Sequence, residues 1–137
     1  MIPSDQLTER NVESWQDVVA FYEELTSKPF WERIAPLLRL TRQIVQSDRA
    51  KRFRGGTSLW LLMISTAAKH GLQPSDPFVC VSLDDDYRLF KFEYWNGENT
   101  TDCYFCDEAD VLATLDRFLE RLWNDTRGHA GHSVSMG

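Results

Sequence analysis

Two cysteines near the middle of the chain have the spacing of a redox or metal-binding pair. Cys103 and Cys106 enclose Tyr104 and Phe105, which gives the pattern Cys-x-x-Cys. A redox cysteine in this pattern needs a helix N-terminus to lower the pKa of its thiol. The sequence instead predicts a strand at Cys103, and the acidic residues that begin at Asp107 raise the pKa of a nearby thiol. We therefore interpret both cysteines as packing residues.

A zinc site on the same pair would require further ligands from distant parts of the chain. Those available are Cys80, His70, His129 and His132. The residues between the two cysteines are bulky aromatics without the glycine of a zinc knuckle, and only two residues separate the last two histidines. We therefore expect no metal and no cofactor, and keep a cysteine- or metal-dependent activity at Cys103 and Cys106 as an alternative.

Three consecutive aspartates, Asp84 to Asp86, resemble the start of a cation-binding loop. A calcium loop needs a glycine at its sixth position and a glutamate at its twelfth, where this chain has Leu89 and Trp95. The aspartates are therefore interpreted as solvated turn residues between two strands.

The glycine-rich stretch 54–58 lacks the lysine and the spacing of a phosphate-binding loop. Gly55 and Gly56 are instead predicted to end a preceding helix. No serine has the context of a nucleophile elbow, and His70, beside a predicted turn, is interpreted as a surface or loop residue. Without a nucleophile, a base and an orienting group, the sequence favours a protein that is not an enzyme.

Basic residues gather in one segment of the chain. Segment 33–54 has seven basic residues and one acid, whereas residues 57–137 hold 6 basic and 13 acidic residues. In the helix predicted there, Arg39, Arg42 and Arg49 share the side opposite the apolar residues and should face water or a partner. Anion or nucleic-acid binding through these arginines is a second alternative. The segment carries +6 and the whole chain −6, so the rest of the chain carries −12, which disfavours it.

The aromatic-rich middle of the chain has the alternation of strands. Within 87–95, Phe90, Phe92 and Tyr94 fall on one side, and a lysine and a glutamate fall on the other. Period two is typical of a strand, and the three aromatics are expected to face a core. A strand over 78–83 precedes it and predicts a hairpin.

A third strand is expected after the next turn. Asn96-Gly97 favours a tight turn that needs positive φ at both residues. The strand over 101–106 would then place Cys103 and Phe105 on the inner side of the sheet.

Helical spacing is clear near the N-terminus. Apolar residues predict a helix over 13–26, with Ser14 and Asp17 as a capping pair. Because Pro36 disfavours helix just before it, we expect a short helical turn and then a longer helix from Leu37.

The last helix has the most regular pattern. Asp107 and Asp110 resemble an acidic capping pair, and a continuous apolar stripe runs through 111–123. This helix should cover the inner face of the sheet. The predicted domain is 1–127, followed by a flexible tail at 128–137.

The stretch 58–66 fits two structures. Its apolar residues suit a buried strand or a buried helix, and periodicity does not separate them. We favour the strand, because it enlarges a sheet that is otherwise small for this length.

Composition sets broad limits. The chain has 137 residues, 42% of them hydrophobic, which suits one globular domain. Its longest apolar run, 59–64, is far shorter than the about 20 residues that cross a bilayer. The N-terminus lacks the pattern of a signal peptide, and three cysteines suggest free thiols. We therefore expect a soluble, cytoplasmic protein that does not enter membranes.

Together these patterns predict an α+β fold with N-terminal helices, a small, mainly antiparallel sheet of three or four strands, and a C-terminal helix packed on the sheet. We expect a small adaptor- or immunity-type protein that binds another protein. Aromatic and arginine residues are frequent anchors of such interfaces. The candidate interaction residues are Arg39, Arg42, Arg49, Tyr87, Trp95 and Tyr104.

Overall fold

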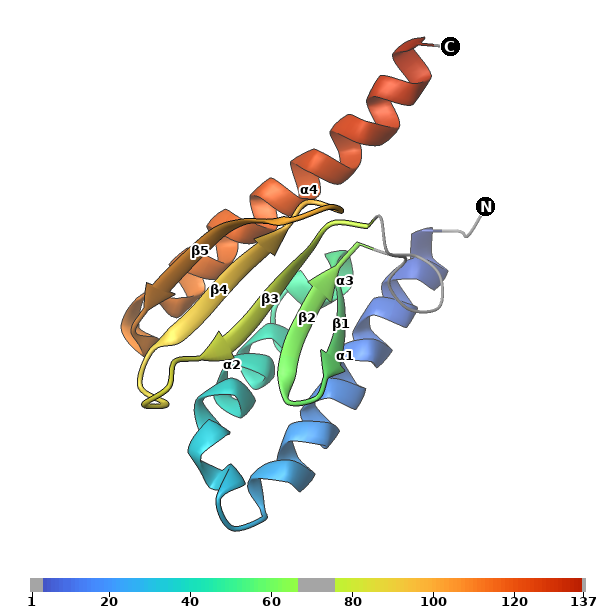
Figure 1. Ribbon diagram of the computed structural model, residues 1–137. Coiled ribbons are helices and arrows are strands. Elements are labelled where there is room, and N and C mark those ends of the chain that lie inside the picture. The colour runs from blue at the N-terminus through green and yellow to red at the C-terminus, as the bar shows by residue number, and fades with distance from the viewer. Residues whose placement is uncertain (1–3, 67–75, 137) are drawn as a thin grey trace.

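The computed structural model describes residues 4–66 and 76–136, and the side chains of residues 6–66 and 76–126. In chain order the elements are α1 (Ser4–Thr26), a 3-10 turn (Trp31–Ile34), α2 (Ala35–Val45), α3 (Arg49–Arg52), β1 (Arg54–Ser58), β2 (Leu61–Ser65), β3 (Phe78–Leu83), β4 (Phe90–Trp95), β5 (Thr100–Cys106), a second 3-10 turn (Glu108–Asp110) and α4 (Val111–Met136). The strands form one antiparallel sheet in the order of the chain (Figure 1). The predicted α+β fold is confirmed, with five strands in the described sheet.

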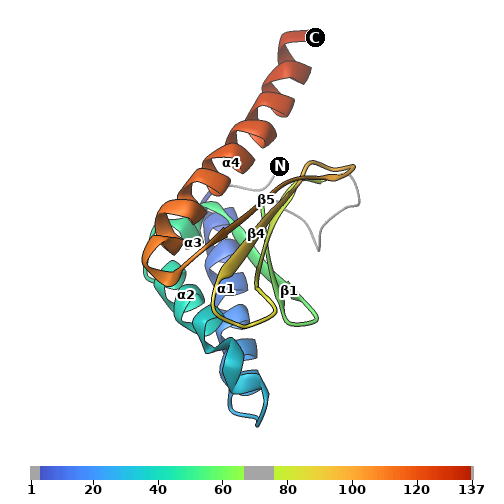
Figure 2. The same cartoon turned by 60° about the vertical axis from the view of Figure 1, so that its left-hand side comes forward.

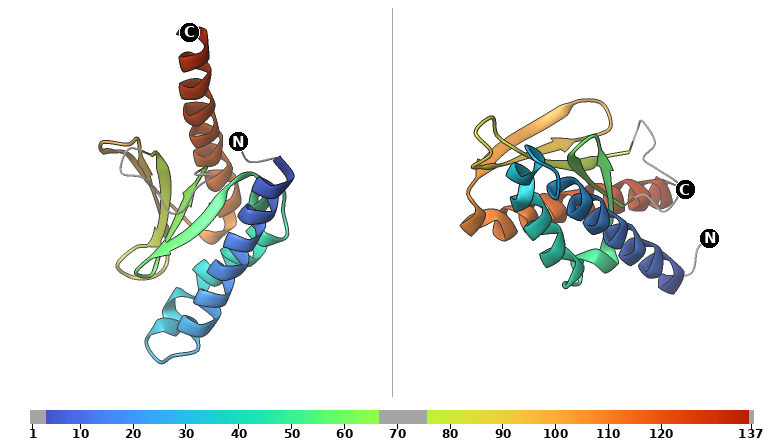
Figure 3. Two further views of the ribbon diagram at one scale, coloured as in Figure 1. Left: turned by 90° about the vertical axis from the view of Figure 1, so that its right-hand side faces the viewer. Right: turned by 90° about the horizontal axis from the view of Figure 1, so that it is seen from below.

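The molecule has two layers. Figures 2 and 3 show α1, α2 and α4 on one side of the sheet, whereas no described helix lies on the other side. We call this second side the open face. None of the described helices combines the length and the apolar character that a bilayer crossing demands.

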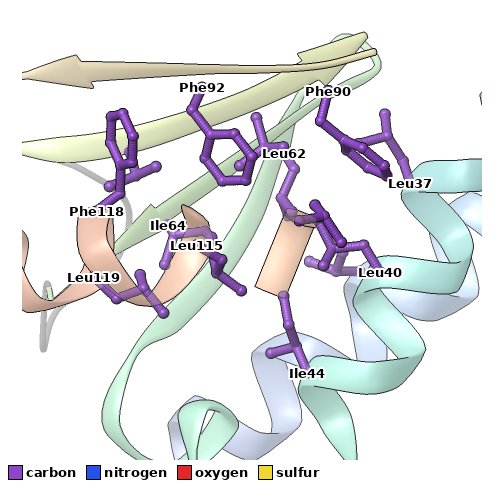
Figure 4. Close-up of a cluster of buried hydrophobic side chains, with 14 of the residues drawn as sticks. Leu37, Leu40, Ile44, Leu62, Ile64, Phe90, Phe92, Leu115, Phe118 and Leu119 are labelled. Atoms are coloured by element: carbon purple, nitrogen blue, oxygen red, sulfur yellow. The ribbon is translucent and has the colours of Figure 1, made fainter. Parts of the chain in front are cut away.

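The core lies between the sheet and the helices, as Figure 4 shows. In β4, Phe90, Phe92 and Tyr94 are buried, which confirms the predicted alternation. The ring centre of Phe92 lies 5.3 Å from that of Phe118 in α4. The largest fully buried side chains include Trp15 and Tyr22 of α1. Figure 4 also labels Leu37, Leu40 and Ile44 of α2, Leu62 and Ile64 of β2, and Leu115 and Leu119 of α4.

Helix α1 begins at Ser4, earlier than the periodicity indicated, and the predicted cap at Ser14 is wrong. Ser14 lies inside the helix, where its hydroxyl donates to the Asn11 carbonyl at 2.6 Å and accepts the Gly55 N–H at 3.0 Å. Trp15 beside it donates its indole N–H to the Phe53 carbonyl at 2.9 Å. A sequence position typical of a cap therefore serves a contact with β1 about forty residues away.

The helix predicted from Leu37 to the glycine pair is interrupted. Helix α2 ends at Val45, a short α3 follows, and Gly55 and Gly56 lie inside β1, so their assignment as a helix stop is wrong. The reason is tertiary packing. A Cβ on Gly55 would lie 2.8 Å from the Trp15 ring, so glycine is needed for α1 to approach the strand.

Most of the ambiguous stretch 58–66 is strand, as favoured, because Leu61–Ser65 form β2. Ser58 ends β1, and a two-residue turn at Leu59 and Trp60 joins the two strands. Between β4 and β5 the loop is longer than the predicted tight turn. Only Gly97 has positive φ (103°), while the Asn96 side chain accepts the N–H groups of Glu98 and Asn99, both at 2.9 Å. The Asn96 N–H also donates to the Asn99 carbonyl at 3.1 Å, so a loop over 96–99 replaces the expected two-residue turn.

Strand β5 is confirmed, but the predicted inward direction of Cys103 and Phe105 is wrong. Cys103 pairs with Glu93 and Phe105 with Lys91, so both lie on the open face. Paired residues share a face, and the alternation that buries Phe92 fixes the opposite face for these two. A register shift at the start of the pairing with β4 was invisible to sequence periodicity.

Helix α4 follows the predicted cap, since the Asp107 carboxylate accepts the Asp110 N–H at 3.1 Å. Its apolar stripe is buried as expected. Tyr94 in β4 fixes the helix through its hydroxyl, which donates to Asp125 at 2.6 Å, and burial together with this bond raises the pKa of Tyr94. The helical backbone extends to Met136, beyond the domain boundary expected at residue 127.

Candidate functional site

The cysteine pair does not converge. Cys103 is exposed on the open face, whereas Cys106 pairs with Phe90 and is buried on the helix side. An odd separation within one strand directs two side chains to opposite faces. Among the described residues no three potential ligands of the His, Cys, Asp or Glu type come together. His70 lies outside the described residues, and so do the side chains of His129 and His132.

The buried thiols are poorly suited to thiolate chemistry. Burial raises the pKa of Cys106, and the acidic residues Asp107 and Asp110 raise it further. Burial and the nearby Glu93 raise the pKa of Cys80 to about 11. A protonated thiol is a weak nucleophile and a poor metal ligand, so these positions favour packing.

The aspartate run forms the turn that the sequence indicated. The Asp84 carboxylate accepts the N–H groups of Arg88 at 2.8 Å and Leu89 at 3.1 Å. These two bonds lower the pKa of Asp84. The side chain is thus engaged in closing the turn between β3 and β4, which also holds Tyr87.

The three arginines of the predicted stripe each meet a carboxylate from another element. The nearest pairs are Arg39 with Glu108 at 2.7 Å, Arg42 with Glu23 at 2.9 Å, and Arg49 with Asp116 at 2.7 Å. Two of them, at Arg39 and Arg49, are bidentate. The bond from Arg39 lowers the pKa of Glu108.

These pairs leave little positive field for a polyanion. Each exposed pair contributes only about 0–1 kcal/mol, so a phosphate could displace a carboxylate at small cost. The displaced acids would nevertheless stay nearby and repel the same phosphate. The ion pairs therefore link α2 to α1 and to the 3-10 turn before α4, and link α3 to α4, so the arginines do not form a bare basic surface.

Beside Arg49, a groove of about 650 Å³ lies between α3 and α4. Arg52 sits 4.7 Å above the centre of the Trp123 ring within it. The groove has two arginines against three carboxylates, which are Asp48, Asp116 and Glu120. Its internal charge pairing gives it no preference for an anion.

Trp95, one of the candidate anchors, lies on the open face. It stacks on Phe78 with 6.0 Å between ring centres, and both line a hollow of about 210 Å³ with Leu61, Met63, Cys80 and Glu93. Pockets for small molecules usually measure about 300–1,000 Å³. The hollow is smaller than that and suits single side chains of a larger partner.

Tyr104 lies on the helix side of β5, with Arg117 5.0 Å from its ring centre. It is 45% exposed. It therefore lies on the opposite face of the sheet from Trp95.

Tyr87, the remaining candidate, belongs to a cluster at one end of the molecule. Its ring centre lies 6.5 Å from that of Phe30 and 6.4 Å from that of Trp60. Arg33 lies 4.7 Å from the centre of the Phe30 ring and 5.9 Å from that of Tyr87. Three turns, which precede α2, join β1 to β2 and join β3 to β4, thus meet here. We call Phe30, Leu59, Trp60 and Tyr87 the aromatic tip.

The backbone of the aromatic tip is unusual. Within the described residues, the non-glycine residues with positive φ are Phe30 (76°), Leu59 (57°) and Tyr87 (58°). All three are bulky and apolar, and each lies in a different turn of the tip. This conformation is energetically unfavourable for residues with a Cβ, and glycine or asparagine usually occupies it.

The tip also exposes apolar surface. Leu59 is 85% exposed and Phe30 is 49% exposed. Tyr87 alone was identified from the sequence. Phe30 and Leu59 were not predicted. The available signal was a bulky apolar residue beside Pro29 in one case and beside Trp60 in the other.

No protein-family model matches the chain, and comparisons with curated proteins and with solved structures give no match. The function is therefore inferred from the surfaces of the molecule itself.

Proposed function

We propose that this protein binds another protein and that the aromatic tip is the part that docks. The observation that carries the proposal is the coincidence of strain and exposure at Leu59 and Phe30. Leu59 buries little of its side chain in its own chain, so that side chain contributes little to the stability of the fold. A position that is both strained and exposed is best explained by a contact made with something else.

Hydrogen bonds fix two of the three turns. The Trp60 carbonyl accepts the Tyr22 hydroxyl at 2.9 Å, which fixes the turn that carries Leu59 to α1. The Asp84 carboxylate closes the turn that carries Tyr87. A pre-formed tip loses little conformational entropy on binding, which favours its use as a rigid anchor.

A protein partner fits the tip better than a membrane or a nucleic acid. Segments 27–33 and 84–89 contain three basic residues, Lys28, Arg33 and Arg88, against the four acids Glu32, Asp84, Asp85 and Asp86. Both anionic lipid surfaces and phosphate backbones favour a basic surface. The partner we propose is a protein with an apolar pocket for Leu59 and Phe30 and with basic residues at the rim that face the aspartates.

The test compares three versions of the full chain that differ only at Leu59. Each carries an affinity tag and is expressed in the source organism, and captured proteins are quantified by mass spectrometry. Leu59→Met keeps the apolar side chain, whereas Leu59→Asn replaces it with a polar one that tolerates positive φ. We expect one specific partner to be captured by wild type and Leu59→Met and lost with Leu59→Asn, while all three fold.

Two results would overturn the proposal. A partner captured equally by all three versions binds elsewhere on the protein. Sedimentation of wild type, but not Leu59→Asn, with vesicles of anionic phospholipid would assign the tip to a membrane surface instead.

A further inference from the structure

The two edges of the sheet are treated differently by the rest of the chain. At the β1 edge, α1 supplies side-chain partners to the backbone. The Gly55 N–H donates to the Ser14 hydroxyl at 3.0 Å, and the Phe53 carbonyl just before the strand accepts the Trp15 indole at 2.9 Å. The Trp15 ring packs directly on Gly55. This edge is therefore occupied by a helix.

The opposite edge, β5, has no such cover. In the described chain β4 is its only strand neighbour, and Figure 1 shows its outer side facing away from the other elements. Every residue of the strand except Cys106 is exposed. In an antiparallel edge strand, alternate N–H and C=O groups point away from the sheet and can pair with another strand.

The register shift where β5 begins to pair with β4 opposes such pairing, but it lies before residues 102–106, which pair with β4 in regular register. Soluble proteins usually protect an edge with lysine, proline or a short strand, and Thr100–Cys106 is seven residues long with neither residue type. Its single charge, Asp102, is paired with Arg121 of α4 at 3.2 Å. Tyr104 on one face and Phe105 on the other are 45% and 46% exposed.

We infer that β5 pairs antiparallel with β5 of a second copy of this chain, so that two five-stranded sheets become one. A two-fold pair brings the same surface of both copies together, which requires a surface that complements itself. With Cys103 near the axis, Asp102 of each copy lies opposite Tyr104 of the other. Arg117 sits over that tyrosine at 5.0 Å, so the acid meets a base and no like charges face each other.

The pairing also joins two surfaces already described. Phe105 and Cys103 lie on the open face, so the open faces of the two copies would form one continuous surface across the axis. The apolar side chain of Phe105 would be covered by its cross-strand neighbour. Backbone pairing and burial of Phe105 would thus stabilise the same interface.

The experiment measures the mass of the purified full chain in solution by light scattering and sedimentation, over a range of concentrations. A reductant is present throughout, so a disulfide through Cys103 plays no part. Wild type is expected to approach twice the 15.9 kDa of the chain as concentration rises. Amide hydrogen exchange at residues 100–106 is expected to slow over the same range.

The decisive variant is Cys103→Lys, which places a lysine of each copy at the axis. Because Cys103 is exposed and pairs with Glu93, a lysine there should leave the fold intact, as checked by circular dichroism. We expect the dimer dissociation constant to rise by roughly tenfold or more. The matched control is Thr57→Lys, an exposed position on the β1 edge, which should dimerise like wild type.

A wild-type chain that stays monomeric at the highest soluble concentration would overturn the inference. A dimer that persists in folded Cys103→Lys, or that forms without slowing exchange at residues 100–106, would place the interface elsewhere and overturn it equally. Because the protein is studied alone, none of these results depends on the aromatic tip.

Discussion

Leu59→Asn is expected to make the protein more stable while weakening its binding to a partner. Leu59 has φ 57° in the two-residue turn between β1 and β2. A residue with a Cβ in this region is roughly 1–2 kcal/mol less favourable than in ordinary conformations, and asparagine recovers part of that through local hydrogen bonds.

Little is lost in return. Complete burial of a leucine side chain contributes about 1.5–3 kcal/mol, and Leu59 is 85% exposed, so its remaining burial contributes roughly 0.2–0.5 kcal/mol. The net change is a stabilisation of about 0.5–1 kcal/mol, which for a chain of this size raises the thermal midpoint by about 2–5 °C. Differential scanning calorimetry of the purified variant measures it.

The effect on binding has the opposite sign. Removal of an apolar side chain from the centre of an interface commonly costs about 2 kcal/mol, which weakens affinity roughly 30-fold. Leu59→Ala separates the two effects, because alanine keeps the strained Cβ but loses the rest of the side chain. It should leave the thermal midpoint near that of wild type and still weaken binding.

A lower midpoint for Leu59→Asn would show that Leu59 makes contacts within its own chain. Contacts within the chain, and not a partner, would then account for the strained backbone at Leu59. Unchanged affinity in both variants would refute the role of the tip as an anchor, whatever the stability.

Other parts of the structure give further predictions. Leu115→Ala, fully buried in α4, should lower the free energy of unfolding by about 2–5 kcal/mol in urea denaturation, and a change near zero would contradict its place in the core. Gly55→Ala should lower it by about 1–3 kcal/mol because the new methyl group meets the Trp15 ring, whereas Gly56→Ala, with open space around it, should change it little. The lowered pKa of Asp84 means that its ionised form is favoured in the folded state, so its contribution is present above the pKa of an unfolded aspartate and is lost as pH falls through the folded value. Asp84→Asn should therefore reduce the loss of stability on acidification, and identical pH profiles for the two proteins would count against the turn.

Much of the fold could be predicted because it depends on local periodicity. The apolar residues of β4 alternate with polar ones, and those of α4 recur at helical spacing. Each pattern puts the apolar residues on one side of its element, and that side is buried. Asp107 could be identified as a cap because its partner is three residues away. Both partners of such an interaction lie within a few residues of each other, so a local sequence pattern reveals them.

Apart from the loop at Asn96, three of the errors involve partners far apart in the sequence. Ser14 resembled a cap, but its hydroxyl serves Gly55. Gly55 resembled a helix stop, but the Trp15 ring requires the space. Cys103 was placed inward because the shift in strand register cannot be read from periodicity alone.

The candidate site was predicted least well. The sequence identified Tyr87 as an outward aromatic, but Phe30 and Leu59 become neighbours of it only when three separate turns meet. By itself the sequence determined the α+β class, the buried faces of β4 and α4, and the lack of a recognisable catalytic motif. Tertiary structure alone decided which turns converge, which edge of the sheet is covered and which arginines are neutralised, because those depend on contacts between residues that no local pattern connects.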